Sequence, residues 1–190
     1  MAQLRLSDEE KVRLIGAIAN DTLTDDMVNE LRARVENPIL TLVEDAVTLG
    51  PTCGYETIAR ATEVFTGGIY YYGCTAEDID VADQQETESR PGRVYAMDPD
   101  KCASATFEEM FTTFGDPGRA AVPQGEIITF CKRTPEKLHQ GGYGGTFFLF
   151  EVKGNRFVAF VDVDSGGLRV DVSRFGYGIR WNAEHRHRPV

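Results

Sequence analysis

Long apolar runs are missing from this chain of 190 residues. No stretch approaches the roughly 18 consecutive apolar residues that a membrane-spanning helix needs. The opening stretch, MAQLRLSDEEKVRLIG, also lacks the apolar segment and the small-residue cleavage site of a secretory signal peptide. These absences predict a cytoplasmic protein that does not bind membranes.

Positive charge is also scarce. The chain has 20 Lys and Arg residues against 30 Asp and Glu residues, which gives a formal net charge of −10. Broad binding to nucleic acid needs clustered basic residues, so we expect no direct nucleic-acid binding. The excess of negative charge has two interpretations. It keeps the protein soluble, or it provides an acidic surface that docks onto a basic protein partner.

The cysteines form no pair at metal-binding spacing. Cys53, Cys74, Cys102 and Cys131 are separated by 21, 28 and 29 residues, so the sequence has no CxxC or CxxH motif. The aspartate pairs in DVDSGG and MDPDK do not continue into a calcium-binding loop closed by a glutamate. We therefore expect reduced thiols, no metal site and no cofactor.

Histidines, which commonly act as general bases, are scarce as well: the chain has only three, and none lies within a predicted core strand. The stretch GPTCGYETIARA is typical of a turn followed by a helix, and it would place Cys53 at a helix N-terminus, where a thiolate is favoured. A cysteine hydrolase also needs a general base, and one hypothesis is His139 with Asp162 orienting its ring. The competing interpretation is a small, half-buried Cys53, because free cysteine is commonly buried.

The glycine-rich stretch GGYGG, residues 141–145, is a candidate ligand contact. It precedes a predicted strand and lacks the Gly-Lys-Ser/Thr ending of a phosphate loop. Glycines allow close approach of the backbone to a ligand, so Tyr143 is kept as a candidate binding residue. A flexible entry to the strand is the alternative.

The last stretch, EHRHRPV, concentrates positive charge in an otherwise acidic chain. His185 and His187 would share one strand face and could bind a metal weakly. Arg186 and Arg188 could bind a phosphate or an acidic partner. The alternative is a solvated chain end without such a role.

The first third of the sequence has the signals of helices. Ser7 and Glu10 match a capping box, and breaks containing Asn, Pro or Gly follow at intervals. Apolar residues recur at helical spacing between the breaks. The pattern predicts four helices, over residues 7–20, 24–37, 38–49 and 55–66.

The middle of the chain mixes both kinds of element. GGIYYYG and RVYAM are predicted strands, and the polar stretch between them is a predicted loop with at most one helical turn. SATFEEMFTTFG predicts a helix capped by Ser104 and ended by Gly115. EIITFCKR, residues 126–133, predicts a strand, and TPEKLHQGG predicts a single helical turn.

The last third predicts an antiparallel meander over residues 146–175. With Gly154-Asn155 and Ser165-Gly166 as its turns, Phe150 faces Ala159 and Asp162 faces Arg169. One face of the meander is then entirely apolar. The fold class that follows is α+β, with an N-terminal helical layer packed against a mainly antiparallel C-terminal sheet. We expect one domain over 1–190, with a helical subdomain over 1–66 and a mainly β part over 67–190.

The second face of the meander is mixed. It carries the apolar residues Phe147, Leu149 and Phe160 and the charged residues Glu151, Asp162 and Arg169. If no second layer covers this face, it forms an apolar patch rimmed by charge, which usually marks a partner or ligand site.

These observations favour a non-enzymatic, acidic binding or regulatory protein, for example an inhibitor, that engages a protein partner through the acidic surface and the mixed face. The alternative is a small enzyme: a cysteine hydrolase that uses Cys53 and His139, or a transferase that holds phosphate with arginine.

Overall fold

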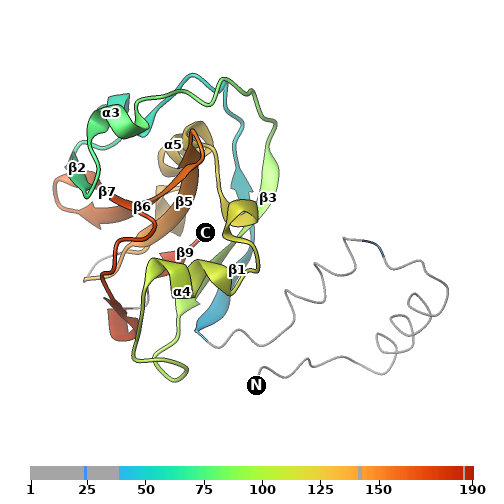
Figure 1. Ribbon diagram of the computed structural model, residues 1–190, viewed down its shortest axis with the longest axis vertical. Helices are drawn as coiled ribbons and strands as arrows, with labels where there is room; N and C mark the ends of the chain where they lie inside the picture. The colour runs from blue at the N-terminus through green and yellow to red at the C-terminus, as the bar shows by residue number, and fades with distance from the viewer. Residues whose placement is uncertain (1–23, 25–38, 141–142, 186) are drawn as a thin grey trace.

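The computed structural model describes residue 24 and residues 39–140, 143–185 and 187–190 (Figure 1). The helices predicted over 7–20 and 24–37 fall almost wholly outside these residues. The strands are β1 (Leu40–Leu49), β2 (Gly68–Tyr72), β3 (Arg90–Met97), β4 (Ser104–Ala105), β5 (Thr146–Val152), β6 (Asn155–Asp164), β7 (Gly167–Arg174), β8 (Trp181–Asn182) and β9 (Arg188–Pro189). The α-helices are α3 (Ala76–Ile79), α4 (Phe107–Thr112) and α5 (Gln124–Arg133), and the 3₁₀ turns are η1 (Ile58–Arg60), η2 (Pro117–Ala120), η3 (Pro135–Lys137) and η4 (Ala183–His185).

A five-stranded mixed sheet, in the order β2-β7-β6-β5-β9, forms the centre of the described part of the chain. Strands β5, β6 and β7 are the predicted antiparallel meander, but β2 joins β7 in parallel and β9 joins β5 in parallel. Sheet rather than helix dominates the structure. The predicted class, an N-terminal helical layer on a mainly antiparallel sheet, is therefore wrong.

Strands β1 and β3 form a separate antiparallel ribbon. The ribbon lies beside β9, where the Met97 N–H donates to the carbonyl of His187 at 2.8 Å. Val47 and Leu49 of the ribbon belong to one hydrophobic core, whereas Leu40 and Met97 belong to a second. The ribbon thus contributes apolar side chains to both cores.

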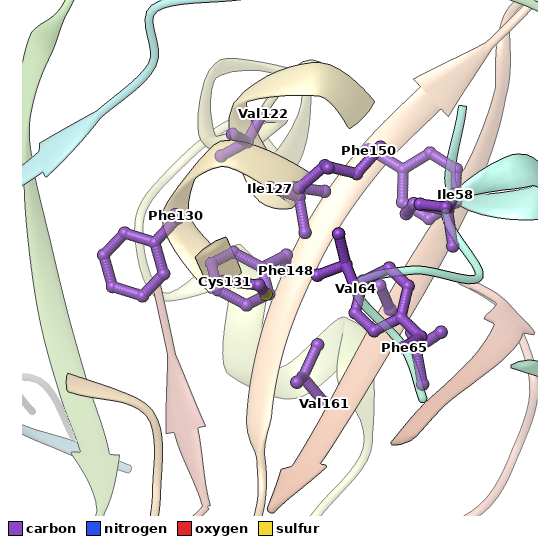
Figure 2. Close-up of a cluster of buried hydrophobic side chains, with 14 of the residues drawn as sticks. Ile58, Val64, Phe65, Val122, Ile127, Phe130, Cys131, Phe148, Phe150 and Val161 are labelled. Carbon is purple, nitrogen blue, oxygen red and sulfur yellow. The ribbon is translucent and has the colours of Figure 1, made fainter. Parts of the chain in front are cut away.

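The first core lies between one face of the central sheet and the elements α5 and η1. Figure 2 shows side chains of α5, among them Ile127 and Cys131, beside Phe148 and Phe150 of β5. The predicted apolar face of the meander is confirmed, because all of its residues lie in this core or pack against it: Phe148, Phe150, Val152, Phe157, Ala159, Val161, Val163, Leu168, Val170 and Val172.

The second core lies on the opposite face of the sheet, under α4 and the short β4–β8 ladder. The ring of Phe107 from α4 meets the ring of Phe147 edge-on, with centroids 5.3 Å apart. Trp181 of β8 packs against Phe147 and Phe160 with centroid distances of 4.9 and 5.0 Å. Aromatic rings from both layers therefore fill this core.

The helix predicted over 38–49 is wrong, because these residues form β1. Bulges interrupt the pairing of β1 with β3 between Leu42 and Glu44 and again between Glu44 and Val47. Each bulge breaks the alternation of inward and outward side chains, so the buried residues Leu40 and Val47 come to lie at a helical spacing. Of the helix predicted over 55–66, only the short turn η1 forms.

The strand predicted over 126–133 is also wrong, because these residues belong to α5. Ile127, Ile128 and Phe130 favour strands by propensity. Every residue of α5 from Gln124 to Cys131 is buried, so the polar face that identifies a surface helix is absent. Tertiary packing between the central sheet and the loops decides the conformation here.

Gln124, at the start of α5, connects three distant segments from a fully buried position. Its side-chain carbonyl accepts the N–H of Ile58 at 3.0 Å. Its side-chain amide donates to the carbonyls of Ile79 at 3.2 Å and Val81 at 3.1 Å. One side chain thereby satisfies buried backbone groups of η1, of α3 and of the loop after α3.

The register of the first hairpin differs from the prediction by two residues. Lys153 and Gly154 form the turn, with φ values of 49° and 77°, and Phe150 pairs with Phe157 rather than with Ala159. A shift by an even number of residues leaves each side chain on its predicted face, which is why the core assignment is still correct. The second hairpin has the predicted register, with Asp162 opposite Arg169.

Other predicted elements are confirmed. GGIYYYG and RVYAM form strands β2 and β3, and TPEKLHQGG contains the turn η3. Helix α4 is capped by Thr106 rather than by the predicted Ser104, because Thr106 and Glu109 form the capping box. Within the described ranges, no helix has the length and apolar character to cross a bilayer.

Candidate functional site

The apolar candidates Phe147, Leu149 and Phe160 are core residues. Phe147 and Leu149 are completely buried, and Phe160 is 6% exposed. Helix α4 and Trp181 form a second layer over these residues. This half of the mixed face is therefore buried and cannot bind a partner.

The other half of the same face is more polar, and it is most exposed at the tyrosines of β2. One row runs from buried Phe147 and Phe160 to Asp171 and Tyr70. A parallel row ends at Tyr72 of β2. In each row, the residues on β5 and β6 are apolar and lie in the second core, whereas the residues on β7 and β2 are polar. We call Tyr70, Tyr72, Asp162, Arg169 and Asp171 the open half-face.

Three charged side chains form a compact group at the centre of the open half-face. The Arg169 guanidinium lies 3.5 Å from the Asp162 carboxylate and 3.3 Å from the Asp171 carboxylate. Burial raises the pKa of Asp171, Arg169 opposes this, and the charge of Asp162 adds to it. With both carboxylates ionised, the group carries one net negative charge.

Two tyrosines flank this charged group on β2, an edge strand that pairs only with β7 among the described residues. Tyr70 is 49% exposed and Tyr72 is 44% exposed. The ring of Tyr70 lies along its own strand above Gly68, where a Cβ atom would meet the ring at 2.9 Å. Arg169 approaches the same ring, with its guanidinium carbon 6.0 Å from the centroid. The ring is thus held at the surface by its neighbours.

Glu151 and Tyr143, the remaining candidate binding residues, lie outside the open half-face. Glu151 is exposed near the β5–β6 turn and pairs with Arg156 at 3.5 Å. Tyr143 is 85% exposed, and its ring centroid lies 5.5 Å from that of His185. Of the predicted binding residues, the structure therefore brings together only Asp162 and Arg169 on this surface.

The candidate nucleophile Cys53 is exposed but does not begin a helix. It follows Thr52, which forms an isolated bridge with Thr87, and η1 begins only at Ile58. The helix N-terminus that was expected to stabilise a thiolate is therefore not formed. The role of Cys53 as a nucleophile stays a prediction without support from the local backbone.

The candidate base His139 lies in a different part of the fold. Its N–H donates to Thr146 Oγ1 at 2.9 Å, and no contact among the described residues joins it to Cys53. Burial and the nearby charge of Arg188 lower the pKa of its ring, while the charge of Asp162 acts in the opposite direction. His139 and Asp162 thus influence each other electrostatically, but Cys53 has no described contact with either of them.

His187 is buried against the aromatic side chains of the second core. Its ring stacks on Phe147 with centroids 5.1 Å apart, and Trp181 lies 5.0 Å away. Both ring nitrogens of His187 and the indole nitrogen of Trp181 are buried and have no hydrogen-bond partner among the described residues. Burial lowers the pKa of His187 to about 4, and the nearby His185 and His139 contribute to this shift.

The glycines of GGYGG allow side chains of the chain itself to pack closely. A Cβ atom on Gly144 would lie 2.4 Å from the His139 ring, and one on Gly145 would lie 2.1 Å from the Phe160 ring. These two glycines thus fit the protein's own rings, which removes the reason to expect a ligand at this backbone.

Replacing Gly145 with alanine is expected to destabilise the protein by about 2 kcal/mol, because the added methyl group overlaps the Phe160 ring in a packed core. Urea unfolding followed by tryptophan fluorescence measures the change. The matched control is Gly176→Ala, where a Cβ atom meets nothing within 4 Å, and it should change stability by less than about 0.5 kcal/mol. Equal stability of the two variants would contradict the close packing of Gly145 against the Phe160 ring.

Within the part of the chain that the structure describes, no group of three or more His, Cys, Asp or Glu residues is placed to hold a metal ion. Comparison with protein-family models, with curated proteins and with solved structures finds no match for this chain.

Sequence reasoning missed Tyr70, Tyr72 and Asp171 as members of the candidate site. Three consecutive tyrosines were visible in GGIYYYG, and the period of a strand places the first and third on one face. The parallel pairing of β2 with β7 was not visible, because the two strands are far apart in the sequence. That pairing brings the tyrosines to the Asp162–Arg169 pair.

Proposed function

We propose that this chain is a non-enzymatic binding protein that engages a macromolecular partner through the open half-face. The observation that carries the proposal is the pair of exposed tyrosines on an edge strand beside the half-buried Asp162–Arg169–Asp171 group. Tyrosine and arginine are the residue types enriched at the energetically important positions of protein interfaces.

The proposed partner is a protein with a basic surface. The charged group carries one net negative charge, and the whole chain carries a formal charge of −10. Electrostatic attraction would therefore speed the encounter with a basic partner and disfavour nucleic acid and anionic membranes. A cytoplasmic location remains part of this proposal.

The edge of β2 adds a second source of affinity. Its main-chain N–H and C=O groups on the side away from β7 pair with no strand among the described residues. An extended segment of a partner could add to this edge and contact Tyr70 and Tyr72 with alternate side chains. The tyrosine rings would supply contact area with little loss of side-chain freedom.

The test compares the wild-type protein with the double variant Tyr70→Ala/Tyr72→Ala. Both proteins are immobilised, incubated with extract from the source cells, and the bound proteins are quantified by mass spectrometry at increasing salt. We expect one or more basic proteins to be retained by the wild type, to be released as salt rises, and to bind the double variant at least about tenfold more weakly.

Tyr55→Ala is the matched control, because Tyr55 is 72% exposed but lies in the segment before η1 and belongs to no strand of the central sheet. It should retain the same proteins as the wild type. Equal retention by the double variant, or loss with Tyr55→Ala alone, would show that the open half-face is not the binding surface.

A further inference from the structure

A pocket of about 390 Å³ opens between the β1–β3 ribbon and the segment from Phe114 to Val122. This volume falls in the range of pockets that bind small molecules. The pocket shares no residue with the open half-face, and it stands apart from the proposed function.

Arginines dominate the charged lining of this pocket. Arg90, Arg93 and Arg119 line it, and Asp45 is the only acidic residue among the described residues that line it. The chain as a whole has a formal charge of −10, so the charge of the pocket lining is opposite in sign to that of the whole chain.

A buried carboxylate fixes the guanidinium of Arg90. The carboxylate of Glu126, which is completely buried in α5, accepts from Arg90 Nε at 3.1 Å and lies 3.0 Å from Nη2. The same carboxylate also accepts from Thr87 Oγ1 at 2.8 Å. No hydrogen bond among the described residues uses Nη1 of Arg90, so this nitrogen remains available to a ligand.

Arg93 and Arg119 are more accessible to a ligand. Arg93 pairs with Asp45 at 2.9 Å, but both side chains are largely exposed, so an anion could compete for the arginine. The guanidinium of Arg119 has no hydrogen bond or ion pair with any described residue. An anion in the pocket would therefore gain a charged donor that no described residue pairs with.

Apolar and aromatic side chains form the rest of the wall. Leu49 and Val122 come from the first core, and Tyr95 and Phe114 pack on each other with ring centroids 4.9 Å apart. A wall of this kind binds the apolar body of a ligand while a few charged groups fix its orientation.

We propose that this pocket binds a small organic anion, in which a phosphate or carboxylate group contacts Arg119, Arg93 and Arg90 and an apolar body contacts Tyr95 and Phe114. Guanidinium groups suit both anions because they donate two parallel hydrogen bonds to a pair of oxygens. The net charge of the three arginines with Asp45 and Glu126 is positive, which favours an anionic ligand over a neutral one.

The test is a titration of the full chain with phenyl phosphate and benzoate as probes, with benzyl alcohol and inorganic phosphate for comparison. Amide chemical shifts of Gly92 and Ala120, which lie in the pocket wall, report binding. We expect at least one of the two organic anions to bind more tightly than either comparison compound, by about tenfold or more.

Arg119→Met should weaken the binding of the organic anion by about tenfold or more, because a charge-assisted hydrogen bond is lost. Arg133→Met is the matched control: Arg133 is exposed, has no partner among the described residues and lies at the end of α5, outside the pocket. It should leave binding unchanged.

Three results would overturn the proposal. The first is no shift of Gly92 or Ala120 with either organic anion up to roughly 10 mM, a concentration that detects even weak binding. The second is equal binding by Arg119→Met and wild type. The third is inorganic phosphate binding as tightly as phenyl phosphate, which would remove the role of the apolar wall. Since the pocket and the open half-face share no residue, none of these results changes the partner-binding test with Tyr70→Ala/Tyr72→Ala.

Discussion

Replacing Gln124 with leucine is expected to lower the free energy of unfolding by about 4 kcal/mol, although leucine is apolar and close to glutamine in size. The substitution leaves the N–H of Ile58 and the carbonyls of Ile79 and Val81 without their partner. Each buried polar group that loses its hydrogen bond costs about 1–3 kcal/mol. Chemical denaturation with urea measures the loss through the shift of the midpoint.

Gln140→Leu is the matched control for this prediction. Gln140 also donates from its side-chain amide to two carbonyls, those of Pro135 and Leu138, but it is exposed, so water can replace the lost donor. Its substitution should cost less than about 1 kcal/mol. If the two variants lose the same stability, Gln124 does not hold η1 and α3 together in the way described.

Acidification from pH 6.5 to pH 4 is expected to remove about 3 kcal/mol of stability through His187 alone. Burial lowers its pKa from 6.5 to about 4 in the folded protein. The unfolded chain therefore binds a proton over this interval that the folded protein does not bind, and stability falls as the pH falls. Above about pH 7.5 both states are neutral at this residue, and stability no longer depends on its titration.

The variant His187→Phe separates this effect from the titration of carboxylates, which both proteins share. Phenylalanine keeps the stacking on Phe147 and removes two unpartnered ring nitrogens, so the variant should be about as stable as wild type at neutral pH. Urea midpoints measured across the interval should fall less steeply for the variant. A smaller slope should remain, because the pKa of His139 is also lowered. An unchanged slope would rule out His187 as the main acid-sensitive group.

Local pairing explains which parts of the fold were predictable. The hairpin between β6 and β7 is specified by a short turn and by the opposite charges of Asp162 and Arg169, all within a few residues of one another. The predicted faces of the meander are correct although the predicted first turn is misplaced by two residues, because a shift by an even number leaves each side chain on the same face. The pairing of Asp162 with Arg169, two residues of the open half-face, was therefore predicted from sequence and is confirmed by the register of β6 and β7.

The rest of the fold depends on contacts that periodicity does not encode. Helix α5 is surrounded by protein on all sides, so its sequence carries no polar stripe, and the bulges of β1 imitate a helical spacing. The arginine-lined pocket shows the same limit. Arg90 and Arg93 come from β3, but Arg119 comes from η2, and only the folded chain brings the three together.

The parallel pairing of β2 with β7 also sets an order of events during synthesis. The hairpins of β5, β6 and β7 join strands that are neighbours in the chain. Strand β2, in contrast, cannot pair until β7 has been synthesised, because Gly68 pairs with Arg169. Non-local pairings of this kind slow folding, and strands that wait are exposed to aggregation. As the chain leaves the ribosome, β2 and its tyrosines therefore remain without a sheet while about 100 further residues are made. Among the strand pairings of the described residues, the one that holds the candidate tyrosines thus spans the longest stretch of chain.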